Sequence, residues 1–211
     1  MTLESITIPW APVKALLNLA GKADIRPYVN GVWIDRAGPE LVIWATTGTV
    51  LGAWRTDEPS TNGPPVFLPR EAVENGKFTG LVVIAGEPGG RMKLGGIGDP
   101  QEWNDPGHTP PAWRNAVPRD RADGTPRQFD LEKALQFEKV RKALKLGAVR
   151  IAHTSEPKRG ESRPDALHVS FKDCPDFVGV LAPIGGAPVD GMRTCAPDWV
   201  HAPATVGADL C

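Results

Sequence analysis

The side chains of this sequence that could do chemistry are mainly lysines and arginines at helical spacing. Residues 12–22 and 130–146 both have the period of an amphipathic helix, with a basic side opposite an apolar side. In the second stretch the apolar side consists of Phe137, Val140, Ala143 and Leu144. The basic sides of the two stretches consist of Lys14, Lys22, Lys139, Arg141, Lys142 and Lys145. Such a surface attracts nucleic-acid phosphates whatever the base sequence, and the attraction weakens steeply with salt.

These basic sides have a second interpretation, because a cationic arc on a surface helix is often only solvated. Two observations favour a polyanionic ligand. Both helices carry the arc, and the whole chain has 24 Lys and Arg against 25 Asp and Glu, so positive charge would be concentrated on one face. We expect charge reversal at Arg141, Lys142 and Lys145 to abolish duplex binding without unfolding the protein, since all three should be exposed.

Catalytic motifs are missing from the sequence. It has no nucleophile elbow, no Walker-type phosphate loop, no His-Glu-x-x-His and no Cys-x-x-Cys. The glycines of residues 95–98 fit a hairpin end better than a phosphate loop. Cys195 and His201 in the tail, or His153 and His168 on strands, fall short of the four convergent ligands of a structural zinc site. The sequence therefore predicts a protein that is not an enzyme and has no cofactor or metal. An enzyme of unrecognised type, with its site in the connector or the tail, is a further alternative.

Strand patterns follow each helix. The period changes to two after the first helix, which predicts an antiparallel meander over residues 29–36, 41–45 and 49–55. Residues 66–76 indicate a strand that runs into one helical turn, and residues 78–85 and 91–97 indicate a hairpin. The second helix should begin near Asp130 and end before Gly147. It is followed by predicted strands over residues 149–154, 167–171 and 177–181.

Length and composition favour two modest domains. The chain has 211 residues, and its 23 Gly and 22 Pro predict frequent turns and few helices. We place the domains at residues 1–108 and 109–186, with a loosely structured tail over 187–211. A Pro- and Gly-rich connector covers residues 98–127, and its part around 113–117 should pack on one domain. Three cysteines, no long apolar run and no signal-like N-terminus predict a cytoplasmic protein without a membrane span.

Three stretches resemble one protein family. Residues 8–26 are similar to the opening strand and inner helix of a domain of the DNA polymerase sliding clamps, the processivity factors of replication. Residues 110–118 are similar to the Trp- and Pro-containing passage that ends one clamp domain. Residues 129–146 and 177–184 are similar to the helix and closing strand of the last domain. The resemblance covers roughly residues 5–185 and is greatest to bacterial or phage β subunits.

The resemblance implies an α+β fold of two tandem clamp-like domains, each with an antiparallel sheet and one or two helices. It implies a ring whose helices face duplex DNA and whose sheets lie outside. Family rings contain six domains, so a chain with two domains would close as a homotrimer, whereas the bacterial subunit has three domains and forms a dimer. The implied partners are duplex DNA and a polymerase or a clamp-binding peptide.

The resemblance also implies a pocket for partner peptides, at Val180, Leu181, Pro183 and Ile184. Ala182 stands where the family often has a larger side chain, which would make the pocket shallower. These residues could equally form a plain buried strand. The leading hypothesis is a processivity factor that encircles or cradles duplex DNA and tethers a polymerase or related factor. The alternative is a clamp-fold protein-interaction or phage accessory module that does not encircle DNA.

Overall fold

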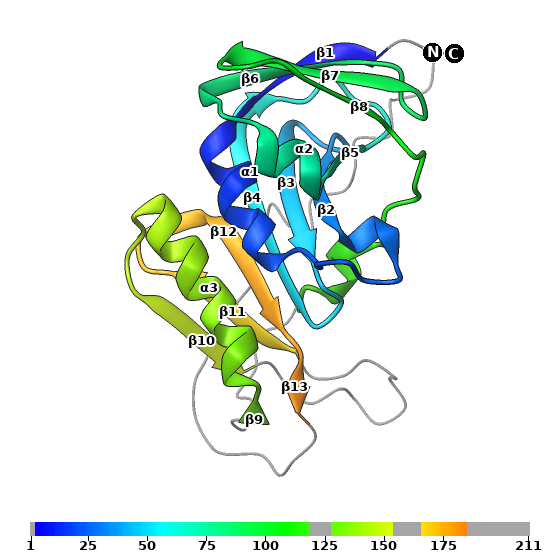
Figure 1. Cartoon of the computed structure of the whole chain (residues 1–211). Coiled ribbons are helices and arrows are strands. Elements are labelled where there is room, and N and C mark those ends of the chain that lie inside the picture. The colour runs from blue at the N-terminus through cyan, green and yellow to red at the C-terminus, as the bar shows by residue number, and fades with distance from the viewer. Residues whose placement is uncertain (1–2, 119–127, 154–165, 185–211) are drawn as a thin grey trace, which may run out of the picture.

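A computed structural model describes residues 3–118, 128–153 and 166–184. Within these residues the chain repeats one unit three times, namely a strand, a helix and three further strands (Figure 1). The first unit comprises β1 (Leu3–Pro9), α1 (Trp10–Leu16) with its 3-10 extension η1 (Leu17–Leu19), a second 3-10 turn η2 (Pro27–Val29), β2 (Gly31–Asp35), β3 (Glu40–Thr46) and β4 (Val50–Pro59). The second comprises β5 (Val66–Pro69), α2 (Arg70–Asn75), β6 (Thr79–Gly86), β7 (Arg91–Ile97) and β8 (Gln101–Asn104). After a 3-10 turn η3 (Trp113–Ala116), the third comprises β9 (Gln128–Phe129), α3 (Leu131–Leu144), β10 (Val149–His153), β11 (Leu167–Phe171) and β12 (Cys174–Leu181), which β13 (Pro183–Ile184) follows.

The strands form antiparallel sheets, so the predicted α+β class with few helices is confirmed. One sheet has the order β1-β6-β7-β8, and a larger one has the order β10-β11-β12-β4-β3-β2-β5. The first two units exchange their opening strands, because β1 pairs with β6 and β5 pairs with β2. The third unit joins the first through β12 and β4, so a single seven-stranded sheet runs through both. A two-stranded pair of β9 and β13 completes the described strands.

The first helix is shifted from its predicted range of 12–22. It begins at Trp10, and Pro12 still lies in the first turn, where a backbone N–H has no helical partner to lose. The 3-10 extension ends at Leu19, so Lys22 lies in the loop beyond it. Arg70 of α2 holds this end, because its guanidinium donates to the carbonyl oxygens of Leu17, Ala20 and Gly21 at 3.0–3.1 Å.

The second predicted helix is α3, and its N-terminus is as expected. The Asp130 carboxylate accepts a hydrogen bond of 2.8 Å from the backbone N–H of Glu132, which makes Asp130 the N-cap. The helix ends at Leu144, because Lys145 adopts a left-handed conformation with φ of 53°. The helix is therefore two residues shorter at this end than the predicted range of 130–146. Phe137 and Val140 are fully buried, but Ala143 is exposed, which corrects its placement on the apolar side.

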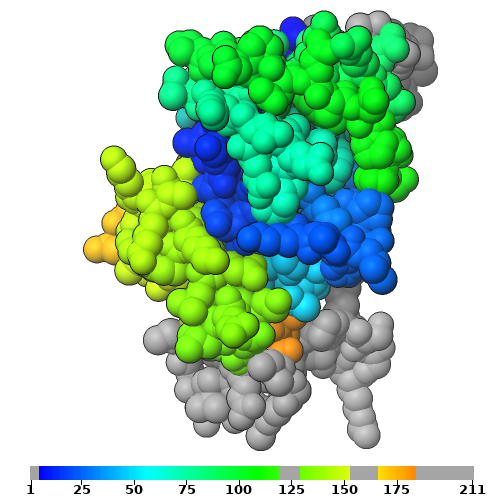
Figure 2. Space-filling model, viewed as in Figure 1, coloured from blue at the N-terminus to red at the C-terminus, as the bar shows by residue number. Residues whose placement is uncertain are grey.

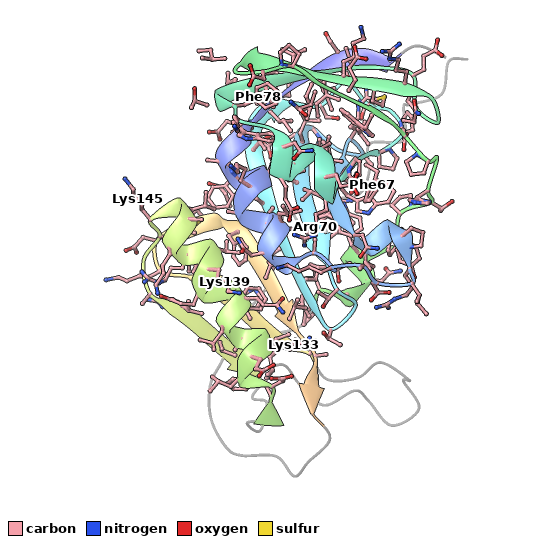
Figure 3. The ribbon with its side chains drawn as sticks, in the orientation of Figure 1. Phe67, Arg70, Phe78, Lys133, Lys139 and Lys145 are labelled. Carbon is pink, nitrogen blue, oxygen red and sulfur yellow. The ribbon has the colours of Figure 1, made fainter. Side chains whose placement is uncertain are left out.

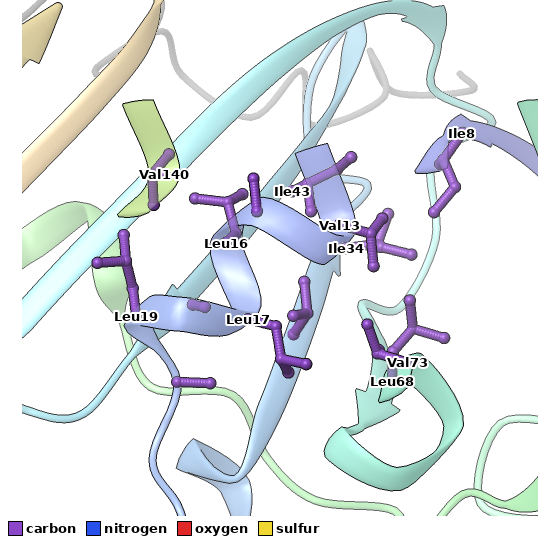
Figure 4. Close-up of a cluster of buried hydrophobic side chains, with 14 of the residues drawn as sticks. Ile8, Val13, Leu16, Leu17, Leu19, Ile34, Ile43, Leu68, Val73 and Val140 are labelled. Atoms are coloured by element: carbon purple, nitrogen blue, oxygen red, sulfur yellow. The ribbon is translucent and has the colours of Figure 1, made fainter. Parts of the chain in front are cut away.

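Two hydrophobic cores lie on opposite faces of the seven-stranded sheet. The inner core lies between the sheets and the helices, and Figure 4 shows Val140 of α3 beside Leu16 and Leu19 of the first unit. The outer core contains Trp33 and Trp44 and is covered by Trp113 and Val117. The prediction that residues 113–117 pack on a domain is therefore confirmed. The remainder of the expected connector contains the strand β8, which the sequence analysis missed.

We call the segment Trp113–Val117 the strap. It is fixed through Asp35, a buried carboxylate at the end of β2 with 8% exposure. The indole N–H of Trp113 donates to Asp35 at 2.8 Å, and the Arg114 guanidinium forms an ion pair with the same carboxylate. The Trp113 ring stacks on Trp44 with 5.9 Å between ring centroids. The strap thus closes the outer face of the sheet with both an aromatic and a charged contact.

Two glycines allow the third unit to join the sheet. Gly52 of β4 and Gly179 of β12 face each other in register, and both point toward the helices. A Cβ at Gly52 would lie 2.3 Å from Leu19, and a Cβ at Gly179 would lie 2.6 Å from the Phe137 ring. Because real Cβ atoms do not approach so closely, η1 and α3 can lie this near to the junction only over glycine.

Candidate nucleic-acid interface

The three helices lie side by side on one face of the molecule. In Figure 2 the surface of α1 runs between those of α3 and α2. The contacts between the helices support this order, because α1 packs against both α3 and α2. Their buried sides face the sheets, so their outward sides form one layer, which we call the helix layer. This arrangement brings cations of the first and third units to the same face.

Most of the predicted cations are exposed. Lys14 lies on the outward side of α1, and Lys22 is exposed in the loop after η1. Lys139, Lys142 and Lys145 are exposed on α3 or at its end, and Figure 3 labels two of them. Lys133, which the sequence analysis left out, is half-buried on the first turn of α3. The positive charge is therefore densest on α3, with Lys14 beside it.

Arg141 differs from the expectation of full exposure. Its side chain is 31% exposed, and its guanidinium donates to the Glu138 carboxylate at 2.6 and 2.8 Å and to the Leu146 carbonyl at 3.2 Å. The hydrogen bonds of this pair lower the pKa of Glu138 and raise the pKa of Arg141. Lys142 stays largely exposed, with its Nζ 3.7 Å from Glu138. Arg141 is thus bonded to the C-terminal end of α3, and the lysines are the cations that remain accessible to a ligand.

Negative charge interrupts the layer on its other side. The outward residues of α2 include Glu71 and Glu74, and the Glu74 carboxylate accepts a 2.9 Å hydrogen bond from Arg70. The layer is therefore cationic over α3 and α1 and acidic over α2. Two exposed leucines, Leu131 and Leu135, also lie on α3. These leucines were not predicted from the sequence, although at 100° per residue they fall on the same side of the helix as Lys139 and Lys142.

The predicted peptide pocket lies on buried residues. Val180 is 6% exposed in the outer core, and Leu181 is fully buried in the inner core. Pro183 is half-buried, and Ile184 is described only through the pairing of β13 with β9. In this conformation the first two side chains contact the protein itself. The pocket stays a prediction.

His168 is an unusual polar residue near Val180. It lies on β11 opposite Val180 and Ala152 and is 4% exposed. Neither ring nitrogen has a hydrogen-bond partner among the described residues. Burial disfavours the charged imidazolium and lowers the pKa of His168 from 6.5 to about 4. The histidine is therefore neutral in the folded protein at neutral pH.

This burial predicts a loss of stability in acid. An unfolded histidine binds its proton near pH 6.5, whereas folded His168 binds it only near pH 4, so unfolding takes up a proton between these values. The contribution of His168 to the free energy of unfolding is complete above pH 6.5 and falls by about 3 kcal/mol as the pH decreases to 4. Urea unfolding from pH 8 to pH 4 should show that the free energy of unfolding of the His168→Leu variant falls by about 3 kcal/mol less than that of the wild type. Parallel profiles of the two proteins would contradict the assignment.

Metal-ligating side chains do not gather in the described part of the chain. Within residues 3–118, 128–153 and 166–184 there is no group of three or more His, Cys, Asp or Glu that could hold a metal ion. Cys195, His201 and Cys211 lie outside these ranges. The described helices include none that is long and apolar enough to cross a membrane.

Comparison with known proteins identifies the fold. No protein-family model and no curated protein matches the sequence. Solved structures do match: the DNA polymerase III subunit beta of Borrelia burgdorferi, with a TM-score of 0.65 and 11% identity, covers 88% of this chain and is itself 65% covered. The corresponding subunit of Pseudomonas aeruginosa has a TM-score of 0.63 and 13% identity, with 86% and 66% covered. That of Thermotoga maritima has a TM-score of 0.63 and 9% identity, with 89% and 67% covered.

These similarities confirm the expected likeness to bacterial clamps at the level of the fold. The chain spans about two thirds of the length of the clamp subunits that it matches. At sequence identities of 9–13%, the likeness lies in the backbone arrangement and does not extend to the side chains of a site. The helix layer described above brings exposed lysines of the first and third units to one face of this fold.

Proposed function

We propose that the chain, having the fold of sliding clamps, is a non-catalytic processivity factor that encircles or cradles duplex DNA and tethers a polymerase or related factor. The observation that carries the proposal is the position of Lys14, Lys139, Lys142 and Lys145, which share one helix layer in a chain of net charge −1. Such a layer supplies diffuse attraction to phosphates and leaves the protein free to move along DNA. The proposal includes a cytoplasmic location.

Retention on DNA would depend on ring closure, so the proposal requires several copies of the chain. If each copy supplies two domains, three copies complete the six domains of a clamp ring. Closure would join outer strands of neighbouring copies, as homo-oligomers commonly do to cover open strands. A mass measurement in solution tests this part, and a monomer at all concentrations would contradict it. A ring also predicts slow dissociation from nicked circular plasmid and fast dissociation from the linearised plasmid.

The DNA contact itself can be tested by charge reversal on α3. The variant Lys139→Glu/Lys142→Glu should bind a fluorescent duplex roughly tenfold more weakly or worse, because two phosphate contacts are lost. The slope of log affinity against log salt should decrease by roughly 2 for the same reason. Fluorescence anisotropy over a range of salt concentrations measures both quantities.

A matched control reverses two charges on another surface. Arg91 and Lys93 are exposed on β7, where both form ion pairs with Glu102. The variant Arg91→Glu/Lys93→Glu has the same change of net charge but leaves the helix layer intact, so its duplex affinity should fall much less. Equal losses in both variants would mean that only net charge matters and that the helix layer is not the binding surface.

The second candidate is a clamp-fold interaction module that does not encircle DNA. The acidic outward side of α2 favours it, because Glu71 and Glu74 occupy the same layer as the lysines. A monomeric protein that dissociates at equal rates from circular and linear plasmid would support this candidate. A closed oligomer retained on circles would support the first.

A further inference from the structure

The outward ridge of α3 has a composition that DNA binding does not explain. Leu131 is 67% exposed and Leu135 is 50% exposed, although leucine is among the residues most often buried. At 100° per residue, these two and Lys139 and Lys142 lie within about 80° of one another around the helix axis. We call these four residues the α3 ridge. Its first half is apolar and its second half is cationic.

The fold does not require the two leucines at these positions. The opposite side of α3 already supplies Phe137 and Val140 to the inner core, and both are fully buried. Other large exposed apolar side chains in the described part of the chain are Leu81, Val83 and Ile97 on β6 and β7, and Ile25 in a loop. The α3 ridge is therefore an apolar patch on the helix layer, separate from the one on the four-stranded sheet.

Duplex DNA matches only half of the ridge. The outer surface of a duplex consists of phosphates and sugars, which pair with the lysines but give the leucines no apolar partner. A protein segment with apolar side chains followed by carboxylates satisfies both halves. The cationic half also has surplus charge, because Arg141 already engages Glu138, while Lys139 is exposed and forms no ion pair with a carboxylate of the described residues.

We infer that the α3 ridge docks an acidic amphipathic helix of a partner protein. The 11 residue steps from Leu131 to Lys142 correspond to roughly 16 Å of helix, so about three turns of a partner would cover the ridge. Its apolar residues, spaced three or four apart, pack on the leucines, as in other cases where an amphipathic helix lies against a helical surface. Its carboxylates face the lysines. This docking goes beyond the proposed DNA contact and does not depend on it, but the two ligands would compete for Lys139 and Lys142.

The test uses the whole chain and a synthetic helical peptide of about 18 residues. The peptide carries two leucines four residues apart in its first half and glutamates in the following turns. Two further peptides change either the leucines to serine or the glutamates to glutamine. Fluorescence anisotropy of labelled peptide without DNA should show binding of the first peptide and at least roughly tenfold weaker binding of the other two.

Variants of the chain assign the contact to the ridge. Leu131→Ser/Leu135→Ser should weaken binding of the first peptide roughly tenfold while leaving circular dichroism and the unfolding midpoint nearly unchanged, because both side chains are exposed. Lys139→Gln/Lys142→Gln should weaken it by a similar factor and make the remaining binding less dependent on salt. The matched control is Leu81→Ser/Val83→Ser, which removes exposed apolar side chains from β6 and should leave affinity unchanged.

Four outcomes would overturn the inference. They are no binding of the first peptide, equal binding of the peptide without leucines, affinity unaffected by Leu131→Ser/Leu135→Ser, and a drop in the oligomeric mass of that variant. The second and third outcomes would indicate plain electrostatic attraction, and the fourth would indicate a contact between copies of this chain. Duplex binding of Lys139→Glu/Lys142→Glu is measured separately from peptide binding. If the DNA proposal fails, the peptide measurement still tests the docking inference.

Discussion

Replacing Gly179 by valine should destabilise the protein by about 3 kcal/mol, because the added side chain meets a filled core. The new Cβ alone would lie 2.6 Å from the Phe137 ring and 2.9 Å from Cβ of Val169. Neither can retreat easily, since both are fully buried. The strain falls on the pairing of β12 with β4, so the third unit should lose protection from hydrogen exchange before the first two. Denaturant unfolding and amide exchange measure the two effects.

The control for this variant is Gly95→Val on β7. A Cβ at Gly95 meets nothing within 4 Å, so this substitution tests the loss of a strand glycine without the clash. Its stability should equal that of the wild type or exceed it, because valine favours strands. A second check combines Gly179→Ala with Phe137→Leu, and the pair should cost less than the sum of the single changes. Additive costs would mean that the Phe137 ring does not restrict the junction.

Replacing Trp113 by alanine should cost about 3–5 kcal/mol of unfolding free energy, because it removes the largest side chain of the strap. Trp113 is 4% exposed, stacks on Trp44 and donates to Asp35 at 2.8 Å. Trp113→Phe should keep most of the packing and lose only the hydrogen bond, at about 1–2 kcal/mol. Urea unfolding of both variants separates the aromatic contribution from the polar one.

Asn115→Ala is the matched control within the strap, because Asn115 is exposed. Its effect should stay within about 0.5 kcal/mol. If Trp113→Ala were as mild as this control, the strap would contribute little to closing the outer face.

Features with strong local signals were predicted correctly from the sequence. The helix α3 has a carboxylate N-cap at Asp130 and a clear helical period, and the hairpin of β6 and β7 has alternating apolar residues around a Gly-rich turn. The resemblance to clamps, based on diffuse motifs, is confirmed at the level of the fold. The small helix α2 was predicted as one helical turn, but its role as the helix of a complete second unit was not recognised.

Features that depend on contacts between distant residues were not predictable. The pairing of β12 with β4 follows from a close fit of Gly52 and Gly179 under two helices, and no local pattern encodes it. The partial burial of Arg141 could have been anticipated, because Glu138 precedes it by three residues on a helix. The acidic side of α2 became relevant only when the fold placed it beside α1. The sequence thus identified the cations, while the arrangement of their neighbours required the structure.

The long separation of β4 and β12 has a consequence for synthesis on the ribosome. Arg55 and Asp176, which join these strands by an ion pair, are 121 residues apart. At a translation rate of about 5–20 residues per second, β12 is synthesised roughly 6–24 s after β4. During that time the backbone edge of β4 is open, and open edges recruit strands of other chains into aggregates. Nascent chains that stall before Cys174 should therefore depend on chaperones far more than the finished protein does.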